Sequence, residues 1–275
     1  MNLPDDGSIP VPQVVPAYFG AGGRQLFGIQ HLPSGDDARD LGVVLCHAAP
    51  QEYSATYWAM HKLARLLTAA GFHVLRFDYS GTGDSAGESD AVSLQRWADD
   101  IPLAMQQLRD ASGVRRVALV GMRLGATLAL RAVAAGARAR EVVMWDPVIS
   151  GSAYLRELDT AEAHRLSLLN YPEPDERLDD EWMGFPFPAT MHAETTAVDL
   201  LTEPLGRLGR MLIVSSSPSP AQEALHARAS AAGVEAAMQV LPDPVLYGGD
   251  AHPGETLLAH EIPVAIVAFL VHCSA

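Results

Sequence analysis

The sequence predicts an α/β domain with a mostly parallel central sheet, helices on both of its faces and an inserted cap. After residue 40, short β-branched runs alternate with longer amphipathic segments, which is the pattern of repeated βα units. Residues 150–208 break this alternation with prolines and a mixture of acidic and aromatic residues, and we expect no strand there. We therefore expect a core formed by residues 1–149 and 209–275, with residues 150–208 inserted as a cap or lid.

The predicted strands are short apolar runs that suit a buried parallel sheet. They span residues 41–46, 72–77, 117–121, 142–145, 211–214 and 235–241. Two earlier stretches, residues 14–19 and 24–31, are expected to form an antiparallel hairpin that precedes these strands.

The amphipathic segments predict five helices. They span residues 57–70, 93–109, 124–135, 220–232 and 260–271. Gly71, Gly136 and Gly233 directly follow three of them, and glycine commonly ends a helix because it accepts a left-handed backbone.

Composition limits the classes of function. Of the 275 residues, 48% are hydrophobic and 19% are charged, which is typical of a compact domain. The net charge is -14, from 33 acidic and 19 basic residues, and no Lys/Arg-rich run interrupts it. We therefore expect neither nucleic acid nor an anionic membrane as a partner.

The two cysteines, Cys46 and Cys273, argue against a disulfide framework and favour a reducing compartment. Neither resembles a metal ligand, and we expect no metal and no cofactor. Residues 1–16 lack the basic and apolar regions of a signal peptide, and no apolar stretch reaches the roughly 18 residues of a transmembrane helix. The sequence therefore predicts a cytoplasmic protein.

The most informative motif is Gly121-Met-Arg-Leu-Gly125, which lies between a predicted strand and a predicted helix. This context is that of the G-x-S-x-G nucleophile elbow, and it predicts the α/β-hydrolase fold. Arg123 stands where the nucleophilic serine would be. Because a guanidinium stays protonated and has no free lone pair, ordinary serine-esterase chemistry is not expected.

Two roles remain open for Arg123. At a helix N-terminus, it would favour a carboxylate, a phosphate or a developing oxyanion, and so could clamp an anionic substrate. Alternatively, Arg123 pairs with an acidic neighbour and plugs the pocket, and Glu52 is the residue that could supply the counter-charge.

Backbone donors for an oxyanion hole are expected near the end of the strand at residues 41–46. His47 occupies the position at which a His-Gly motif usually supplies this hole, although Ala48 replaces the glycine. The amide of Ala48 or Ala49, together with that of Leu124, could still form it, because backbone donors do not depend on the side chain.

A general base and its acid are predicted from topology. His252 lies between the last predicted strand and the last predicted helix, where this fold places its histidine. The loop at residues 215–220 contains no carboxylate, so the usual acid is missing. Asp146, at the end of the preceding strand, is the alternative acid, and Asp250 is a fallback.

A second motif, Asp78-Tyr-Ser-Gly-Thr-Gly-Asp-Ser85, matches a D-x-x-G-x-G-x-S turn common in α/β hydrolases. Its role is usually structural. A weaker hypothesis makes Ser85 or Cys46 a relocated nucleophile, although Cys46 fits better as a small buried hydrophobic residue.

These segments, together with Trp145-Asp-Pro147, resemble the α/β hydrolases associated with exosortase A systems, specifically the type with arginine at the elbow. The resemblance covers roughly residues 41–154. It implies a hydrolase-like scaffold near polysaccharide or secondary-metabolite pathways. The chain departs from the expected pattern at Ala48-Ala-Pro-Gln-Glu52.

Two functions follow from these features. The first is an enzyme that acts on an acyl, ester or thioester substrate with an anionic group, using His252 as base and Arg123 as clamp. Its substrate would be a small molecule or a carrier-bound acyl group. The reaction could be hydrolysis, acyl transfer, cyclisation or elimination. The sequence also allows a homodimer. The second is a catalytically silent protein that binds a ligand or acts as a scaffold.

Overall fold

The computed structural model describes residues 13–34, 38–168, 181–241 and 260–274. In these ranges, eight strands form one sheet in the order β1-β2-β4-β3-β5-β6-β9-β10. The strands are β1 Gln13–Phe19, β2 Leu26–Leu32, β3 Leu41–Cys46, β4 Val74–Phe77, β5 Arg116–Met122, β6 Glu141–Trp145, β9 Arg210–Ser215 and β10 Glu235–Val240.

The pairing confirms a mostly parallel sheet with an antiparallel entry. β1 pairs antiparallel with β2, and β2 pairs antiparallel with β4. All the other neighbours, from β4 through β10, are parallel. The chain crosses over after β3 so that β4 and β5 lie on either side of it, and this places the carboxyl ends of β3, β5 and β6 next to one another.

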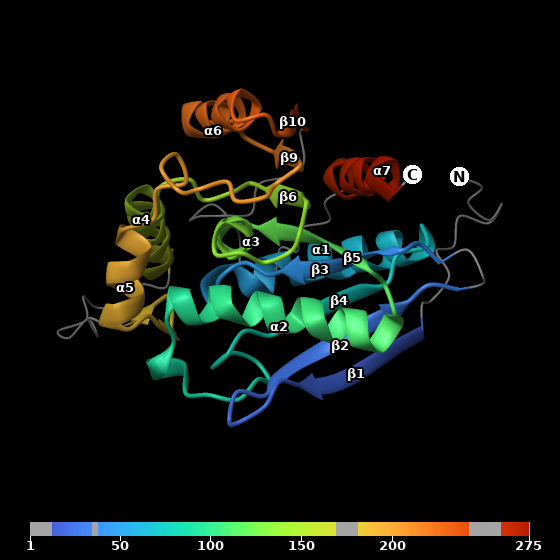
Figure 1. The fold of residues 1–275 in the computed structure, drawn as a ribbon. Coiled ribbons are helices and arrows are strands. Elements are labelled where there is room, and N and C mark those ends of the chain that lie inside the picture. The colour runs from blue at the N-terminus through green and yellow to red at the C-terminus, as the bar shows by residue number, and fades with distance from the viewer. Residues whose placement is uncertain (1–12, 35–37, 169–180, 242–259, 275) are drawn as a thin grey trace.

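Helices cover both faces of the sheet (Figure 1). Helices α1 (Pro50–Ala69) and α7 (Glu261–Ser274) pack on one face, and α2 (Leu94–Ser112), α3 (Leu124–Ala134) and α6 (Pro220–Ala231) pack on the other. Each face buries its own apolar cluster against the strands. This two-sided burial is what the continuous apolar strand runs require.

The helix ends mostly agree with the prediction. Gly71, Gly136 and Gly233 have φ angles of 91°, 108° and 83°, as expected for glycines that follow a helix. The start of α1 differs, because the helix begins at Pro50 and not at residue 57. Proline suits the first helical position, where its fixed φ fits and no backbone N–H is needed.

The segment between β6 and β9 contains α4 (Gly151–Leu168), α5 (Ala189–Thr196) and two short strands, β7 (Glu181–Trp182) and β8 (Phe185–Pro186). The expectation of no strand in residues 150–208 is therefore wrong. Met183 and Gly184, with φ angles of 53° and 83°, form the tight turn of this hairpin. A hairpin of two residues per strand leaves no alternating pattern in the sequence.

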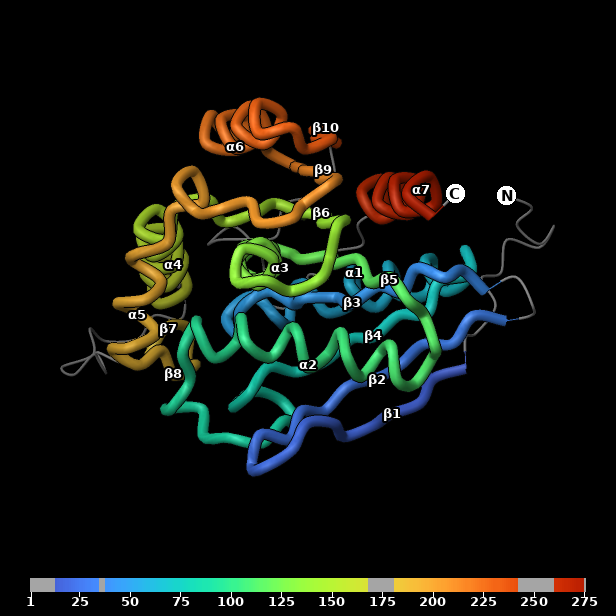
Figure 2. The backbone as a smooth tube through the Cα atoms, viewed as in Figure 1, coloured from blue at the N-terminus to red at the C-terminus, as the bar shows by residue number. Residues whose placement is uncertain are grey.

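Figure 2 shows α4, α5 and the β7–β8 hairpin together at the end of the sheet where β3, β5 and β6 finish. Ser150 and Asp199 form an isolated bridge that joins the two ends of this segment. Gly151 is needed beside it, because a Cβ there would lie 1.6 Å from the carbonyl oxygen of Thr195. The described parts of this segment therefore lie at the carboxyl edge of the sheet.

Candidate functional site

The turn between β5 and α3 holds Arg123 in a strained conformation. Its φ is 53° and its ψ is -122°, in a region that L-residues with side chains rarely adopt. The flanking glycines make the turn sterically feasible. A Cβ on Gly121 would lie 2.4 Å from backbone atoms of Ala126, and a Cβ on Gly125 would lie 2.2 Å from the carbonyl oxygen of His47.

The guanidinium of Arg123 is buried between two carboxylates. Its Nε donates to Glu52 Oε1 at 2.7 Å, and its Nη2 donates to Glu157 Oε1 at 2.6 Å. The guanidinium carbon of Arg123 lies over the Tyr154 ring, 5.5 Å from the ring centroid. The hydroxyl of Tyr154 donates a hydrogen bond to Glu52 Oε2 at 3.0 Å. Burial alone would lower the pKa of Arg123, but Glu52 and Glu157 raise it well above its ordinary value.

This cluster combines three elements: Glu52 from α1, Arg123 from the β5–α3 turn, and Tyr154 with Glu157 from α4. The sequence suggested the pairing with Glu52 as one alternative and missed the other two residues. A signal for them existed, because Tyr154 and Glu157 are three positions apart and so share one face of the helix that follows β6.

Asp146 lies at the carboxyl end of β6, buried and with a positive φ of 42°. Its carboxylate accepts three hydrogen bonds, from Ser215 Oγ at 3.0 Å, from Ser216 N at 2.9 Å and from Ser216 Oγ at 2.7 Å. Ser215 and Ser216 begin the loop at residues 215–220 that contains no carboxylate. This loop therefore orients Asp146, the carboxylate at the end of the neighbouring strand. His252 and Asp250, the predicted base and fallback acid, lie outside the described residues.

The segments expected to form an oxyanion hole come together. His47, Ala48 and Ala49 link β3 to α1, and all three are buried. Gly125, next to Leu124 at the start of α3, contacts the carbonyl groups of Cys46 and His47 so closely that no side chain would fit. The close approach of these two backbone segments depends on that glycine.

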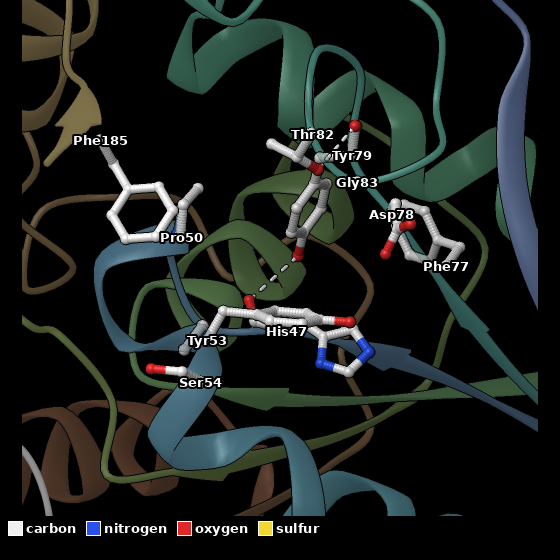
Figure 3. A pocket seen from close by; sticks show the side chains of 11 residues that line it. His47, Pro50, Tyr53, Ser54, Phe77, Asp78, Tyr79, Thr82, Gly83 and Phe185 are labelled. Carbon is white, nitrogen blue, oxygen red and sulfur yellow. Dashed lines mark hydrogen bonds between the residues drawn. The ribbon is translucent and has the colours of Figure 1, made fainter. Parts of the chain in front are cut away.

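A cavity of about 280 Å³ opens beside the β3–α1 junction. Its lining comes from that junction, from the end of β4 and the loop after it, and from the β7–β8 hairpin. It consists of His47, Ala48, Pro50, Tyr53, Ser54, Phe77, Asp78, Tyr79, Thr82, Gly83 and Phe185. In Figure 3, Phe185 and Pro50 lie on one side of this space, and Asp78 and Phe77 on the other. Of these residues, the sequence singled out His47 and Ala48 for binding.

The cavity is largely apolar, and its histidine is neutral. Burial, with a further effect of Arg76, lowers the pKa of His47 to about 3, so its imidazole carries no charge near pH 7. Burial raises the pKa of Asp78, whose Oδ2 accepts a hydrogen bond from the backbone N–H of Asp84 at 3.1 Å. An anion placed next to the Asp78 carboxylate would be repelled, so this cavity does not suit an anionic group.

The turn at residues 78–85 and Cys46 serve structure. Ser85 Oγ donates to the carbonyl of Asp78 at 2.6 Å and accepts from the amide of Phe27 at 2.8 Å, which ties this turn to β2. The Cys46 thiol is fully buried, and burial raises its pKa to about 12. Neither side chain is therefore placed as a nucleophile. Within the described ranges, no cluster of three or more His, Cys, Asp or Glu side chains could hold a metal ion.

Most of the chain superposes on solved structures. It matches hypothetical protein PA2218 from Pseudomonas aeruginosa with a TM-score of 0.63 and 17% identity, covering 96% of this chain and 94% of that chain. It matches XC6422 from Xanthomonas campestris, a member of a/b serine hydrolase without lid, with a TM-score of 0.54 and 15% identity, covering 94% and 93%. The chain has the α/β-hydrolase fold.

Other comparisons agree with this fold. The esterase Pf2001 from Pyrococcus furiosus matches with a TM-score of 0.60 and 16% identity, covering 96% of this chain and 94% of that chain. A family model described as serine aminopeptidase, S33, matches residues 40–173 of the chain. No curated protein matches the sequence. None of the described helices is long and apolar enough to cross a membrane.

Proposed function

We propose that this protein of the α/β-hydrolase fold is a ligand-binding protein without serine-hydrolase chemistry at the turn of Arg123. The main support is that the Arg123 guanidinium is buried and forms ion pairs with Glu52 at 2.7 Å and Glu157 at 2.6 Å. A guanidinium cannot attack a carbonyl group, and here its single positive charge is already paired with two carboxylates. The turn that would display a nucleophile instead closes off one part of the carboxyl edge of the sheet.

The ligand would lie in the neighbouring cavity. Tyr53, Phe77 and Phe185 provide aromatic contacts, and a few polar groups such as His47 would orient the ligand. Because the lining is largely apolar, the histidine is neutral and Asp78 disfavours anions, we assign this cavity to a small, uncharged, largely apolar molecule such as an aromatic or acyl compound. The inserted segment would act as its cap through Phe185.

Two measurements test this function. Fluorophosphonate probes should label no serine, and p-nitrophenyl butyrate should not be turned over. The neutral dye N-phenyl-1-naphthylamine should bind with enhanced fluorescence, and Tyr53→Ala should weaken its binding at least about tenfold. The matched control is Tyr18→Ala, because Tyr18 is 57% exposed on β1 and does not line the cavity. Serine labelling, ester turnover or an equal effect of the two variants would refute the proposal.

A second candidate function is favoured by the geometry of Asp146. Its carboxylate is held by Ser215 and Ser216 at the position of an alternative triad acid. An Asp146–His252 pair would then act as general base on an acyl, ester or thioester substrate with an anionic group, in a biosynthetic pathway. Arg123 would then bind the anionic group of the substrate in place of Glu157, whose side chain is 42% exposed. The ion pair between Arg123 and Glu52 would remain.

This second candidate makes a distinct prediction. An anionic thioester such as succinyl-coenzyme A should be turned over, and both His252→Ala and Asp146→Asn should reduce kcat by about 100-fold or more. Arg123→Gln should mainly raise KM if Arg123 binds the substrate equally in the ground and transition states. Unchanged turnover in the His252 and Asp146 variants would exclude this mechanism, and turnover that depends on them would exclude the binding-only function.

A further inference from the structure

A second concave surface lies at the opposite end of the sheet from the insertion. It is a groove of about 1680 Å³ where β5, β6 and β9 begin, at Arg116, Glu141 and Arg210. Seven of the chain's 19 basic residues line it, against two acidic residues, Glu141 and Glu235. We call it the arginine groove, and its basic residues are Arg109, Arg115, Arg116, Arg138, Arg140, Arg207 and Arg210.

Local ion pairs neutralise only part of this charge. Arg116 pairs with Glu141 at 2.5 Å, Arg210 pairs with Glu235 at 2.8 Å, and Arg115 pairs with Asp40 at 2.7 Å. The other four arginines form no ion pair with any part of the chain that the structure describes; they are Arg109, Arg138, Arg140 and Arg207. The groove therefore keeps a local positive charge.

Two of these four arginines, Arg109 and Arg138, are also close enough to affect one another. Burial and the nearby charge of Arg138 lower the pKa of Arg109, whose Nη2 donates to the carbonyl of Arg138 at 3.3 Å. Arg138, Arg140 and Arg207 are exposed to solvent. Like charges held together at a surface repel one another, and a bound anion would relieve this repulsion.

The remaining lining favours an extended occupant. Much of it consists of small residues, including Ala134, Gly136, Ala137, Ala139 and Gly206. Small side chains leave room for a polypeptide backbone to approach, while the long arginine side chains reach carboxylates on either side of it. Guanidinium groups bind carboxylates with two parallel hydrogen bonds, which gives such contacts direction as well as charge.

We propose that the arginine groove binds an acidic segment of a partner protein. The chain as a whole has a net charge of -14, so the surface outside the groove is strongly acidic. A membrane or a long nucleic acid extends beyond the groove and would meet this repulsive surface. A short acidic segment fits within the groove, and repulsion elsewhere restricts it to that one docking position. This inference is independent of the function assigned to the cavity.

The test uses a short fluorescein-labelled peptide of repeated Glu-Gly units, measured by fluorescence anisotropy at low salt. The peptide should bind, the corresponding Gln-Gly peptide should not, and added salt should weaken binding. Arg138→Gln/Arg207→Gln should lower the affinity by about tenfold or more. The matched control is Arg156→Gln/Arg165→Gln, which removes the same charge from α4, outside the groove, and should bind as the wild type does.

Other outcomes would overturn the proposal. One is equal loss of affinity in both double variants, which would indicate general charge attraction. Another is absence of peptide binding at low salt by folded protein, with folding checked by the thermal midpoint. A third is groove-dependent binding of inorganic phosphate, duplex DNA or phosphatidylglycerol vesicles without peptide binding, because the site would then recognise phosphate.

Discussion

At the scale of single residues, Arg123 and Glu52 depend on each other. Both are buried, and Glu52 Oε1 is 2.7 Å from Arg123 Nε. Removing one partner leaves the other charge in a poorly solvated place, which costs about 3–5 kcal/mol, whereas replacing both by neutral groups costs much less. We therefore predict that Arg123→Leu lowers the free energy of unfolding by about 3–5 kcal/mol.

The double variant Arg123→Leu/Glu52→Gln should recover most of this loss, because the amide oxygen of the new glutamine would still accept the hydroxyl of Tyr154. Glu157 should tolerate the change, since its side chain is 42% exposed. Urea denaturation of the wild type, both single variants and the double variant gives the coupling energy. Additive effects of the two substitutions would show that the ion pair is not the source of the stability.

At the scale of elements, the junction of β3 with the start of α3 depends on Gly125. A Cβ at this position would lie 2.2 Å from the carbonyl oxygen of His47 and 2.3 Å from that of Cys46, and neither backbone segment can move easily in a buried sheet. Gly125→Ala should therefore lower the free energy of unfolding by about 3 kcal/mol, at the upper end for overpacked cores. Thermal unfolding followed by circular dichroism measures this loss.

Gly113→Ala provides the comparison. Gly113 ends α2 with a φ of 76°, but nothing lies within 4 Å of the position of its Cβ. The substitution should cost only about 1 kcal/mol, from the left-handed backbone. Gly125 has no left-handed backbone, so if Gly125→Ala cost no more than Gly113→Ala, the close β3–α3 contact would not require a glycine.

The sequence predicted the core elements because their signals are local. Apolar runs located the strands of the sheet, and Gly71, Gly136 and Gly233 marked the helix ends correctly. The segment between β6 and β9 was harder to predict, since the β7–β8 hairpin has only two residues in each strand. Its position is set by tertiary contacts, such as the Ser150–Asp199 bridge, that no local pattern encodes.

The candidate site was predicted where topology alone brings residues together. Arg123 and Glu52 both follow strands that are neighbours in the sheet, β5 and β3, so their pairing could be proposed. Glu157 and Phe185 come from the segment between β6 and β9. The spacing of Tyr154 and Glu157 indicated a shared helix face, but not that this face packs against Arg123. The arginine groove was missed for a related reason, because its residues are scattered over the sequence and converge only at the starting ends of the strands.

At the scale of the whole molecule, two histidines buried beneath α1 link stability to pH. Burial lowers the pKa of His47 to about 3, and burial with the charge of Arg76 lowers that of His31 to about 4. Arg76 Nε donates to His31 Nε2 at 3.1 Å, so this histidine must keep an unprotonated nitrogen. In the unfolded chain both would titrate near 6.5, so below that pH the unfolded state binds more protons.

Stability should therefore fall as the pH drops from about 6.5 toward 3 to 4. For the fully buried His47 alone, the loss between pH 7.5 and pH 5 is about 2 kcal/mol. Urea denaturation of the wild type and of His47→Asn at both pH values measures this loss of unfolding free energy. Subtracting the loss of the variant from that of the wild type cancels the contributions of titrating groups that both proteins share, including Asp78 and Asp100. Because Asn cannot be protonated, the variant should lose about 2 kcal/mol less on acidification. An equal loss in the two proteins would mean that His47 does not resist protonation in the fold.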